Sequence, residues 1–270
     1  MKTNIDFVSA LGSFFSLRDW KARSFYLGIY LIITSIPLLV SYFFFSILIS
    51  TEIPALIIIG LTFLSFGFFT YCFAYFYVLG YRIDVARAFR DDEDIEKVHV
   101  FYEAMRRMKE GKKLFFTMAI YYLPVICLSV LGYILFLIPG IFGPNLQILF
   151  YIGGMLLLMI GFFLYLFVYY LIYPIVGAKI VNKAKFSDLL DFVNSWKHIK
   201  NNWKNLIYIN IGIYLSNLLM STALIIGFLS IFLCLGIILF PIIWVVGNVY
   251  IHHVHAELIG NFAKNLNYNG

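Results

Sequence analysis

The chain has 270 residues, of which 62% are hydrophobic and only 13% are charged, and its formal net charge is +6. A soluble domain typically carries about 25% charged residues, and a water-soluble fold of this size cannot hide so much apolar surface. The composition therefore excludes an ordinary soluble domain and predicts an integral membrane protein. The excess of Lys and Arg indicates loops that face the cytoplasm and anionic lipid head groups, rather than a nucleic-acid surface.

Six apolar segments are each long enough to cross a bilayer as a helix, which takes about 20 residues. The last two come from one uncharged run, residues 206–251, which is too long for a single helix and is divided near residues 227–230. The fourth is expected to end at Pro174, because a proline inside a helix removes a hydrogen bond. The predicted spans are residues 25–49, 55–79, 114–137, 146–173, 206–227 and 231–251.

The predicted fold is an all-α polytopic bundle that forms one integral membrane domain over residues 1–270. All 20 Lys and Arg residues lie before the first span, in the polar stretches 81–113 and 177–204, or in the C-terminal tail. The three short turns on the other side hold none. The positive-inside rule then places both termini in the cytoplasm. Residues 1–23 lack the pattern of a secretory signal and are expected to form an interfacial helix.

The polar stretches are expected to contain amphipathic helices. Residues 81–113 hold half of all formal charge, and the helix predicted at 96–110 places Val98, Tyr102 and Met105 on one stripe. A second helix is predicted at 188–199, with Ser187 as its N-cap. Both are expected to lie on the inner membrane surface; the alternative is that they pack on the ends of the spans.

Four ionisable residues cluster just beyond the sixth span: His252, His253, His255 and Glu257. On a helix, His252 and His255 share one face, whereas His253 and Glu257 share another. A metal site needs several ligands that converge at one point. We therefore treat these four residues as candidates for metal binding, with a cluster of neutral histidines at the membrane edge as the expectation.

Other polar groups are weaker candidates. The acidic run at 91–96 lacks the glycine and terminal glutamate of an EF-hand and is expected to be a solvated loop with local ion pairs. Asn210, Asn217 and Asn248 are candidates for a polar pocket, although such side chains more often hydrogen-bond between helices. The absence of charge from the centres of the spans counts against an ion-coupled pump. The three cysteines lie in apolar segments and are expected to be reduced. They are Cys72, Cys127 and Cys234.

A weak internal repeat supports three hairpins of two spans each. Gly28-Ile29-Tyr30-Leu31 follows Trp20-Lys21, and the same four residue types at 212–215 follow Trp203-Lys204. Lys112-Lys113 leads into a similar segment at 120–123. Parallel repeats are a common way to build membrane bundles. A chance match in a chain rich in Ile and Tyr is the alternative.

The order of these segments resembles a known family. Its marks in this chain are Gly80-Tyr81, Gly111, residues 120–124, Tyr173-Pro174, Lys185-Phe186, Asn201-Asn202 and Gly260. They resemble the uncharacterised prokaryotic membrane proteins grouped as domain of unknown function 4013, many of them from methanogenic archaea. The likeness would extend from about Asp19 to the C-terminus. A Leu-Pro step usual in the family is replaced here by Asp94-Ile95-Glu96. The family carries no established activity, so the resemblance implies no functional residue.

These features favour a non-enzymatic membrane scaffold or accessory subunit that acts through its cytoplasmic loops, with a protein partner at 81–113. The alternative is a transport component that binds a neutral or hydrophobic solute in a pocket lined by Asn and aromatic side chains. A third class, an enzyme that acts on lipid, would have only the His252–Glu257 group as candidates. No cofactor, catalytic residue or nucleic-acid partner is expected.

Overall fold

The structure, a computed structural model, describes residues 6–51, 55–100, 103–137, 144–230 and 236–266. Within these residues every regular element is a helix, which confirms the all-α prediction. The elements are α1 (Phe7–Ser16), α2 (Trp20–Thr51), α3 (Ala55–Asp91), η1 (Ile95–Lys97), α4 (Ala104–Leu137), α5 (Pro144–Phe167), the π-helix η3 (Val168–Ile172), α6 (Tyr173–Val181), α7 (Phe186–Leu190), α8 (Phe192–Leu229) and α9 (Gly236–Asn265).

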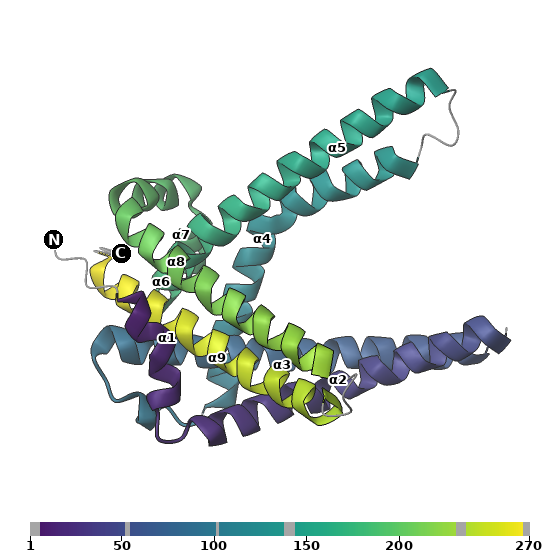
Figure 1. The fold of residues 1–270 in the computed structure, drawn as a ribbon. Helices are drawn as coiled ribbons and strands as arrows, with labels where there is room; N and C mark the ends of the chain where they lie inside the picture. Colours follow the sequence, from purple (N-terminus) through teal and green to yellow (C-terminus); the bar gives the residue numbers. More distant parts are fainter. Residues whose placement is uncertain (1–5, 52–54, 101–102, 138–143, 231–235, 267–270) are drawn as a thin grey trace.

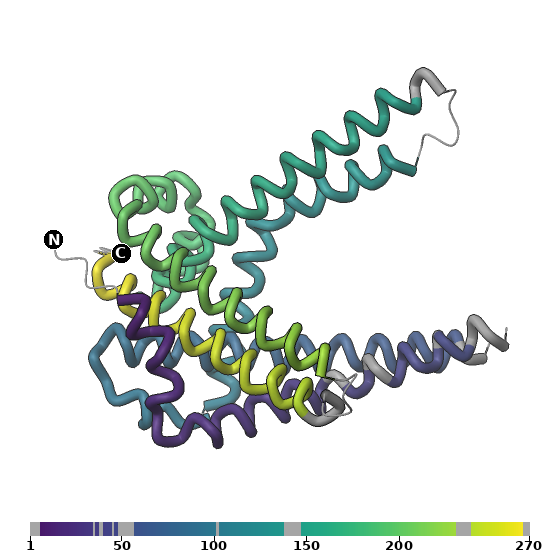
Figure 2. The backbone as a smooth tube through the Cα atoms, in the orientation of Figure 1, coloured from purple at the N-terminus to yellow at the C-terminus, as the bar shows by residue number. Residues whose placement is uncertain are grey.

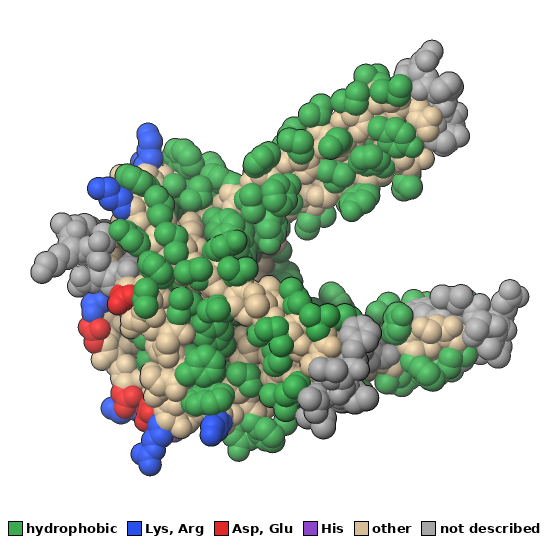
Figure 3. Space-filling view, in the orientation of Figure 1, with side chains coloured by type: hydrophobic (Ala, Val, Ile, Leu, Met, Phe, Trp, Pro, Cys, Tyr) green, Lys and Arg blue, Asp and Glu red, His purple; other side chains and the backbone are tan. Residues whose placement is uncertain are grey.

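Three antiparallel hairpins organise the helices (Figure 1). Helix α2 packs along α3, α4 along α5, and α8 along α9. The α2–α3 and α4–α5 hairpins diverge as two arms of a V (Figure 2), and α9 of the α8–α9 hairpin packs against α2 and α3. Helix α1 and the C-terminal end of α9 lie at the base, where the charged side chains gather, whereas hydrophobic side chains cover the arms (Figure 3).

Four continuous helical segments are long and apolar enough to cross a membrane: Ile57–Asp91, Ala104–Leu137, Gln147–Val181 and Phe192–Leu229. Their outward faces are covered with apolar rings, such as Phe69 at 62% exposed and Phe163 at 60%. Leaving a ring of this size in water instead of an apolar medium costs roughly 1.5–3 kcal/mol. The chain is therefore a membrane-embedded protein, because lipid removes that cost.

The helix of the fourth predicted span continues beyond Pro174, the residue at which the span was expected to end. The helix continues through the π-helical turn η3 into α6, with Pro174 in the first turn of α6. A proline lacks the N–H of a normal helical hydrogen bond, and its ring clashes with the carbonyl four residues earlier. The wider π turn just before it relieves that clash, so α5, η3 and α6 form one long helix.

The polar stretch 81–113 is mostly the continuation of the spanning helices rather than a loop. Helix α3 runs to Asp91 and α4 begins at Ala104, so the separate helix predicted at 96–110 is wrong before Ala104, and its remainder is the start of α4. Between them, the carbonyl of Val100 accepts hydrogen bonds from Arg107 and from Tyr77. These side-chain bonds hold the segment in a non-helical path. Of the predicted stripe, Tyr102 lies outside the described residues and Met105 is exposed.

The second predicted surface helix, 188–199, is also wrong in its boundaries. Ser187 lies inside the short helix α7, and Asp191 is the residue that caps α8, because its carboxylate accepts from the backbone N–H of Asn194 at 2.9 Å. Helix α8 then runs to Leu229 with non-helical backbone angles only at Asn202. It ends within the predicted break at 227–230, as the sequence indicated.

The helices pack most closely at the charged base, through glycines. A Cβ on Gly80 of α3 would overlap the backbone carbonyl of Arg107 in α4, and one on Gly111 would overlap that of Phe76. A Cβ on Gly260 of α9 would overlap the carbonyl of Ala86. Small residues allow this approach of backbones, which is how membrane helices gain packing energy.

Helix α1 packs one face on α9. Ala10 and Phe14 are fully buried, and the Phe14 ring lies 5.4 Å from that of His253, whereas Val8 and Phe15 are exposed. A helix therefore exists within the predicted range 1–23, over Phe7–Ser16, and its position at a membrane surface stays a prediction. The exposed acidic run at 91–96 also agrees with expectation, since Arg90 pairs with Asp91 at 2.7 Å.

Candidate functional site

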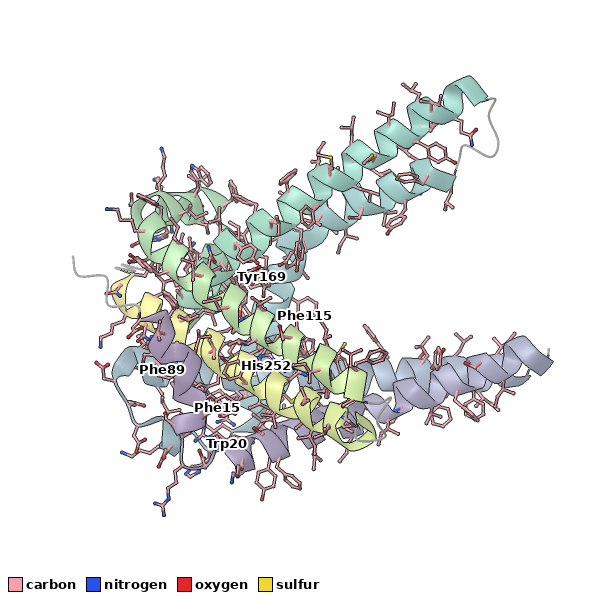
Figure 4. The ribbon with its side chains drawn as sticks, viewed as in Figure 1. Phe15, Trp20, Phe89, Phe115, Tyr169 and His252 are labelled. Atoms are coloured by element: carbon pink, nitrogen blue, oxygen red, sulfur yellow. The ribbon has the colours of Figure 1, made fainter. Side chains whose placement is uncertain are left out.

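A cavity of about 740 Å³ lies where α3, α4, the α5–α6 helix, α8 and α9 meet. It is at the bottom of the notch between the two arms (Figure 3), close to Phe115, Tyr169 and His252 (Figure 4). Ligand pockets in proteins typically measure about 300–1,000 Å³ and combine an apolar wall with a few polar groups. This cavity has that character, with one arginine, two histidines, two asparagines and several tyrosines in its lining.

Arg82 of α3 supplies the positive charge of the cavity and is only 8% exposed. Its Nε lies 2.9 Å from Nδ1 of His252, and its Nη1 donates to the hydroxyl of Tyr173. Arginine is always protonated and only donates, so Nδ1 of His252 must accept. The ring of His252 is then neutral, with its proton on Nε2, which leaves an N–H donor on the imidazole.

Arg82 forms no ion pair among the described residues. The nearest acid along the chain, Asp84, is committed elsewhere. Its carboxylate accepts from Arg107 at 2.7 Å and from Arg106 at 3.0 Å, and Arg87 lies 3.6 Å away. Asp84 therefore ties α3 to α4 and does not compensate the charge in the cavity.

A ladder of three tyrosines lines the α5–α6 side. Tyr165, Tyr169 and Tyr173 are four residues apart, and successive ring centroids lie 5.9 and 6.0 Å from each other in stacked geometry. The amide of Asn217 donates to the hydroxyl of Tyr169 at 2.8 Å. The π-helical turn Val168–Ile172 lies within this ladder, and such turns are frequent at functional sites. Helix α5–α6 thus presents a row of hydroxyl groups to the cavity.

His255 follows His252 by one turn of α9 and lines the same cavity. It is 3% exposed, and its Nε2 has no hydrogen-bond partner within the described part of the chain. Leaving a buried polar group without a partner costs about 1–3 kcal/mol. A group of this kind in a cavity wall is available to a ligand.

The four residues predicted as a group are divided between two sides of α9. His252 and His255 face the cavity, whereas His253 packs against Phe14 and the carboxyl group of Glu257 accepts from Ser13. The predicted pairing by helix face is thus confirmed. Burial raises the pKa of the Glu257 carboxyl, and the bond from Ser13 opposes that rise. Among the described residues, no three His, Cys, Asp or Glu side chains are grouped so as to hold a metal ion.

Two of the three predicted asparagines reach the cavity. Asn217 and Asn248 line it, whereas Asn210 lines a separate shallow hollow with Tyr170 and Tyr214. Sequence reasoning missed Arg82 and the tyrosine ladder. The four-residue spacing of the tyrosines was the signal that could have found the ladder. Cys72 and Cys127 are free thiols, and Cys234 lies outside the described residues.

Comparison with known proteins gives one family match. The model described as "Protein of unknown function (DUF4013)" matches residues 63–235. This range covers Arg82, the tyrosine ladder and Asn217, and it stops before His252 and His255. It is shorter than the range expected from the sequence marks, which reached the C-terminus. Neither the curated proteins nor the solved structures give a match to the chain.

Proposed function

The chain belongs to the DUF4013 family, and from this premise we propose that it is a non-enzymatic membrane protein that binds a solute in the cavity between its hairpins, as a component of a transport process. The observation that carries the proposal is the cavity of about 740 Å³, which a bundle packed solid with side chains would lack. Its aromatic and Asn lining is the lining expected of a site for a solute with a hydrophobic body.

The proposed topology is six spans in the cell membrane with both termini in the cytoplasm. Three hairpins provide six long helices, and the charged base holds the Lys and Arg residues that the positive-inside rule places in the cytoplasm. The three hairpins also support the proposed repeat. Anionic lipid head groups are the proposed partners of this base, and the exposed Val8, Phe15, Val193 and Trp196 are proposed to dip into the interface.

Filling the cavity tests the proposed function. Ala119 of α4 lines it, so Ala119→Trp occupies the space, whereas Leu149→Trp places the same ring on the exposed outer face of α5. The proteins are purified in lipid nanodiscs, and molecules released on denaturation are identified by mass spectrometry. We expect a small molecule to accompany the wild type and Leu149→Trp but not Ala119→Trp. Equal content in all three proteins, or none in any, would contradict solute binding.

A scaffold that acts through the cytoplasmic face is the second candidate, favoured by the exposed acidic run at 91–96. We rank it second because much of the 81–113 stretch is used inside the protein: Arg82, Asp84 and Arg107 are all buried. Crosslinking from a photoreactive residue at Asp92 would test this function. Capture of a reproducible protein partner would support the scaffold, and capture of lipid alone would count against it.

A further inference from the structure

Arg82 is a buried cation for which the described part of the chain supplies no counter-ion. We propose that the solute bound in the cavity is an anionic amphiphile, whose acidic head group binds Arg82 and the neutral donors around it, and whose apolar tail lies against α4. This inference rests on the solute-binding function proposed above and names the chemistry of the solute. The alternative function expected from the sequence involves a neutral or hydrophobic solute; the proposed solute keeps a hydrophobic tail and adds a negative charge.

The electrostatic argument starts from the cost of burying charge. A guanidinium keeps its proton, so it cannot avoid the free-energy cost of burial by becoming neutral. An uncompensated buried charge costs several kcal/mol. Asp84, two positions along α3, is held by the guanidinium groups of Arg106 and Arg107 and is not available to Arg82. An acidic ligand would supply the missing charge.

The neutral groups around Arg82 can donate hydrogen bonds to an anion, and none of them carries a negative charge. His252 carries its proton on Nε2, because its Nδ1 accepts from Arg82. Nε2 of His255 is buried and unpartnered among the described residues, and the hydroxyl of Tyr173 can donate onward after accepting from Arg82. The described lining contains no Asp or Glu. A site with one guanidinium and several neutral donors fits a carboxylate or phosphate group, since charge-assisted bonds are the strongest available.

The remainder of the lining fits a tail. Phe115, Met118, Val125 and Ile126 of α4 form an apolar wall. Phe115 and Ile126 are 11 positions apart, which corresponds to about 16 Å along a helix. Ile126 lines the cavity and is also 53% exposed. The wall therefore continues from the charged end of the cavity to the surface that faces lipid, so an amphiphile can keep its tail in an apolar environment throughout.

A purely structural role for Arg82 is the competing explanation, since it joins α3 to Tyr173 and His252. Such a role needs no charge, whereas an anion site does. Binding to the full chain in nanodiscs of zwitterionic phosphatidylcholine separates the two. Dodecyl phosphate is the probe, with dodecanol and dodecyltrimethylammonium as probes of the same tail and inorganic phosphate as the head group alone. Dissociation constants are measured by native mass spectrometry.

We expect dodecyl phosphate to bind about tenfold or more tightly than the other three probes, and Arg82→Gln to weaken it by a similar factor. Arg18→Gln, which removes the same charge from the exposed surface, should leave binding unchanged. His255→Phe should weaken binding severalfold and serves as the test if Arg82→Gln does not fold. The proposal is overturned if each of Arg82→Gln and His255→Phe that folds binds dodecyl phosphate as tightly as the wild type.

The same measurements separate this proposal from the proposed function. Equal affinity for the phosphate, the alcohol and the ammonium would overturn the anionic head group and leave solute binding in place. Inorganic phosphate that binds as tightly as dodecyl phosphate would overturn the amphiphile and point to a free anion. If no probe binds and Ala119→Trp behaves as the wild type, both proposals fail.

Discussion

Two buried arginines at the charged base are used in opposite ways. Arg107 is 2% exposed and lies against the carboxylate of Asp84, so its charge is balanced within the protein. Arg82 is 8% exposed, belongs to the same region, and faces a cavity without a carboxylate partner among the described residues. Burial is similar in the two cases, and the balance of charge differs. The comparison teaches that an unbalanced buried charge, rather than a buried charge as such, indicates a binding site.

The largest expected effect comes from breaking the balanced pair. Asp84→Ala leaves the buried guanidinium of Arg107 without its counter-ion, and removing one partner of a buried pair typically costs about 3–5 kcal/mol. We expect a loss of this size in the free energy of unfolding, measured by SDS titration in mixed micelles. Asp92→Ala removes an acid that is 75% exposed in its ion pair with Lys264, and should cost less than about 1 kcal/mol. If Asp84→Ala lowers the free energy of unfolding as little as Asp92→Ala does, the ion pairs of Asp84 do not contribute to stability.

The helix crossing that positions this pair gives the next effect. Gly80→Ala places a Cβ onto the backbone carbonyl of Arg107, and overpacking of this kind costs about 1–3 kcal/mol. The cost should appear in the same unfolding measurement. Gly153→Ala is the matched control in a spanning helix, because its Cβ would meet Leu135 at 3.6 Å, an ordinary contact. An unchanged free energy for Gly80→Ala would mean that α3 and α4 do not cross as closely as described.

The unbalanced arginine should matter little for stability. Arg82→Gln removes a buried charge that has no counter-ion among the described residues, while its amide can still donate toward His252 or Tyr173. We therefore expect the ligand-free protein to lose no stability, because the cost of burying the uncompensated charge disappears and offsets the hydrogen bonds lost with the guanidinium. Thermal unfolding in detergent, after removal of bound molecules, measures this. If Arg82→Gln lowers the free energy of unfolding as much as Asp84→Ala does, Arg82 stabilises the fold, and the contrast between the two arginines fails.

Glu257 gives the smallest effect and extends the comparison to an acid. It lies beyond the predicted sixth span at 231–251, is 5% exposed, and has its pKa raised by burial. Unlike Arg82, Glu257 can avoid the free-energy cost of a buried charge, because its carboxylate becomes neutral when it binds a proton. The folded state then binds more protons than the unfolded state, so stability falls as pH rises from the ordinary pKa near 4.5 through the raised folded pKa. Glu257→Gln should remove this slope, as measured by unfolding at several pH values, with Glu93→Gln as the exposed control.

Much of the architecture was predictable because it depends on hydropathy and helix periodicity, which can be read directly from successive residues. The apolar segments and the all-α class followed from hydropathy, and the pairing of His252 with His255 followed from helix periodicity. The helix predicted at 96–110 failed because side chains of Tyr77 and Arg107 take the carbonyl of Val100. Periodicity contains no information about such bonds. The continuation of the helix through Pro174 depended on a π turn that no propensity predicts.

The sequence by itself determined that this is a helical membrane protein. The free energy of transferring a segment from water to lipid is a sum over its side chains, and that sum depends only on composition. The sequence also marked the glycines Gly80, Gly111 and Gly260 without saying what they touch. Only the tertiary structure decided which polar groups meet. Arg82 finds Tyr173 and His252 at separations of 91 and 170 residues along the chain. The cavity and its unbalanced charge exist only once three hairpins are packed together, because each wall comes from a different hairpin.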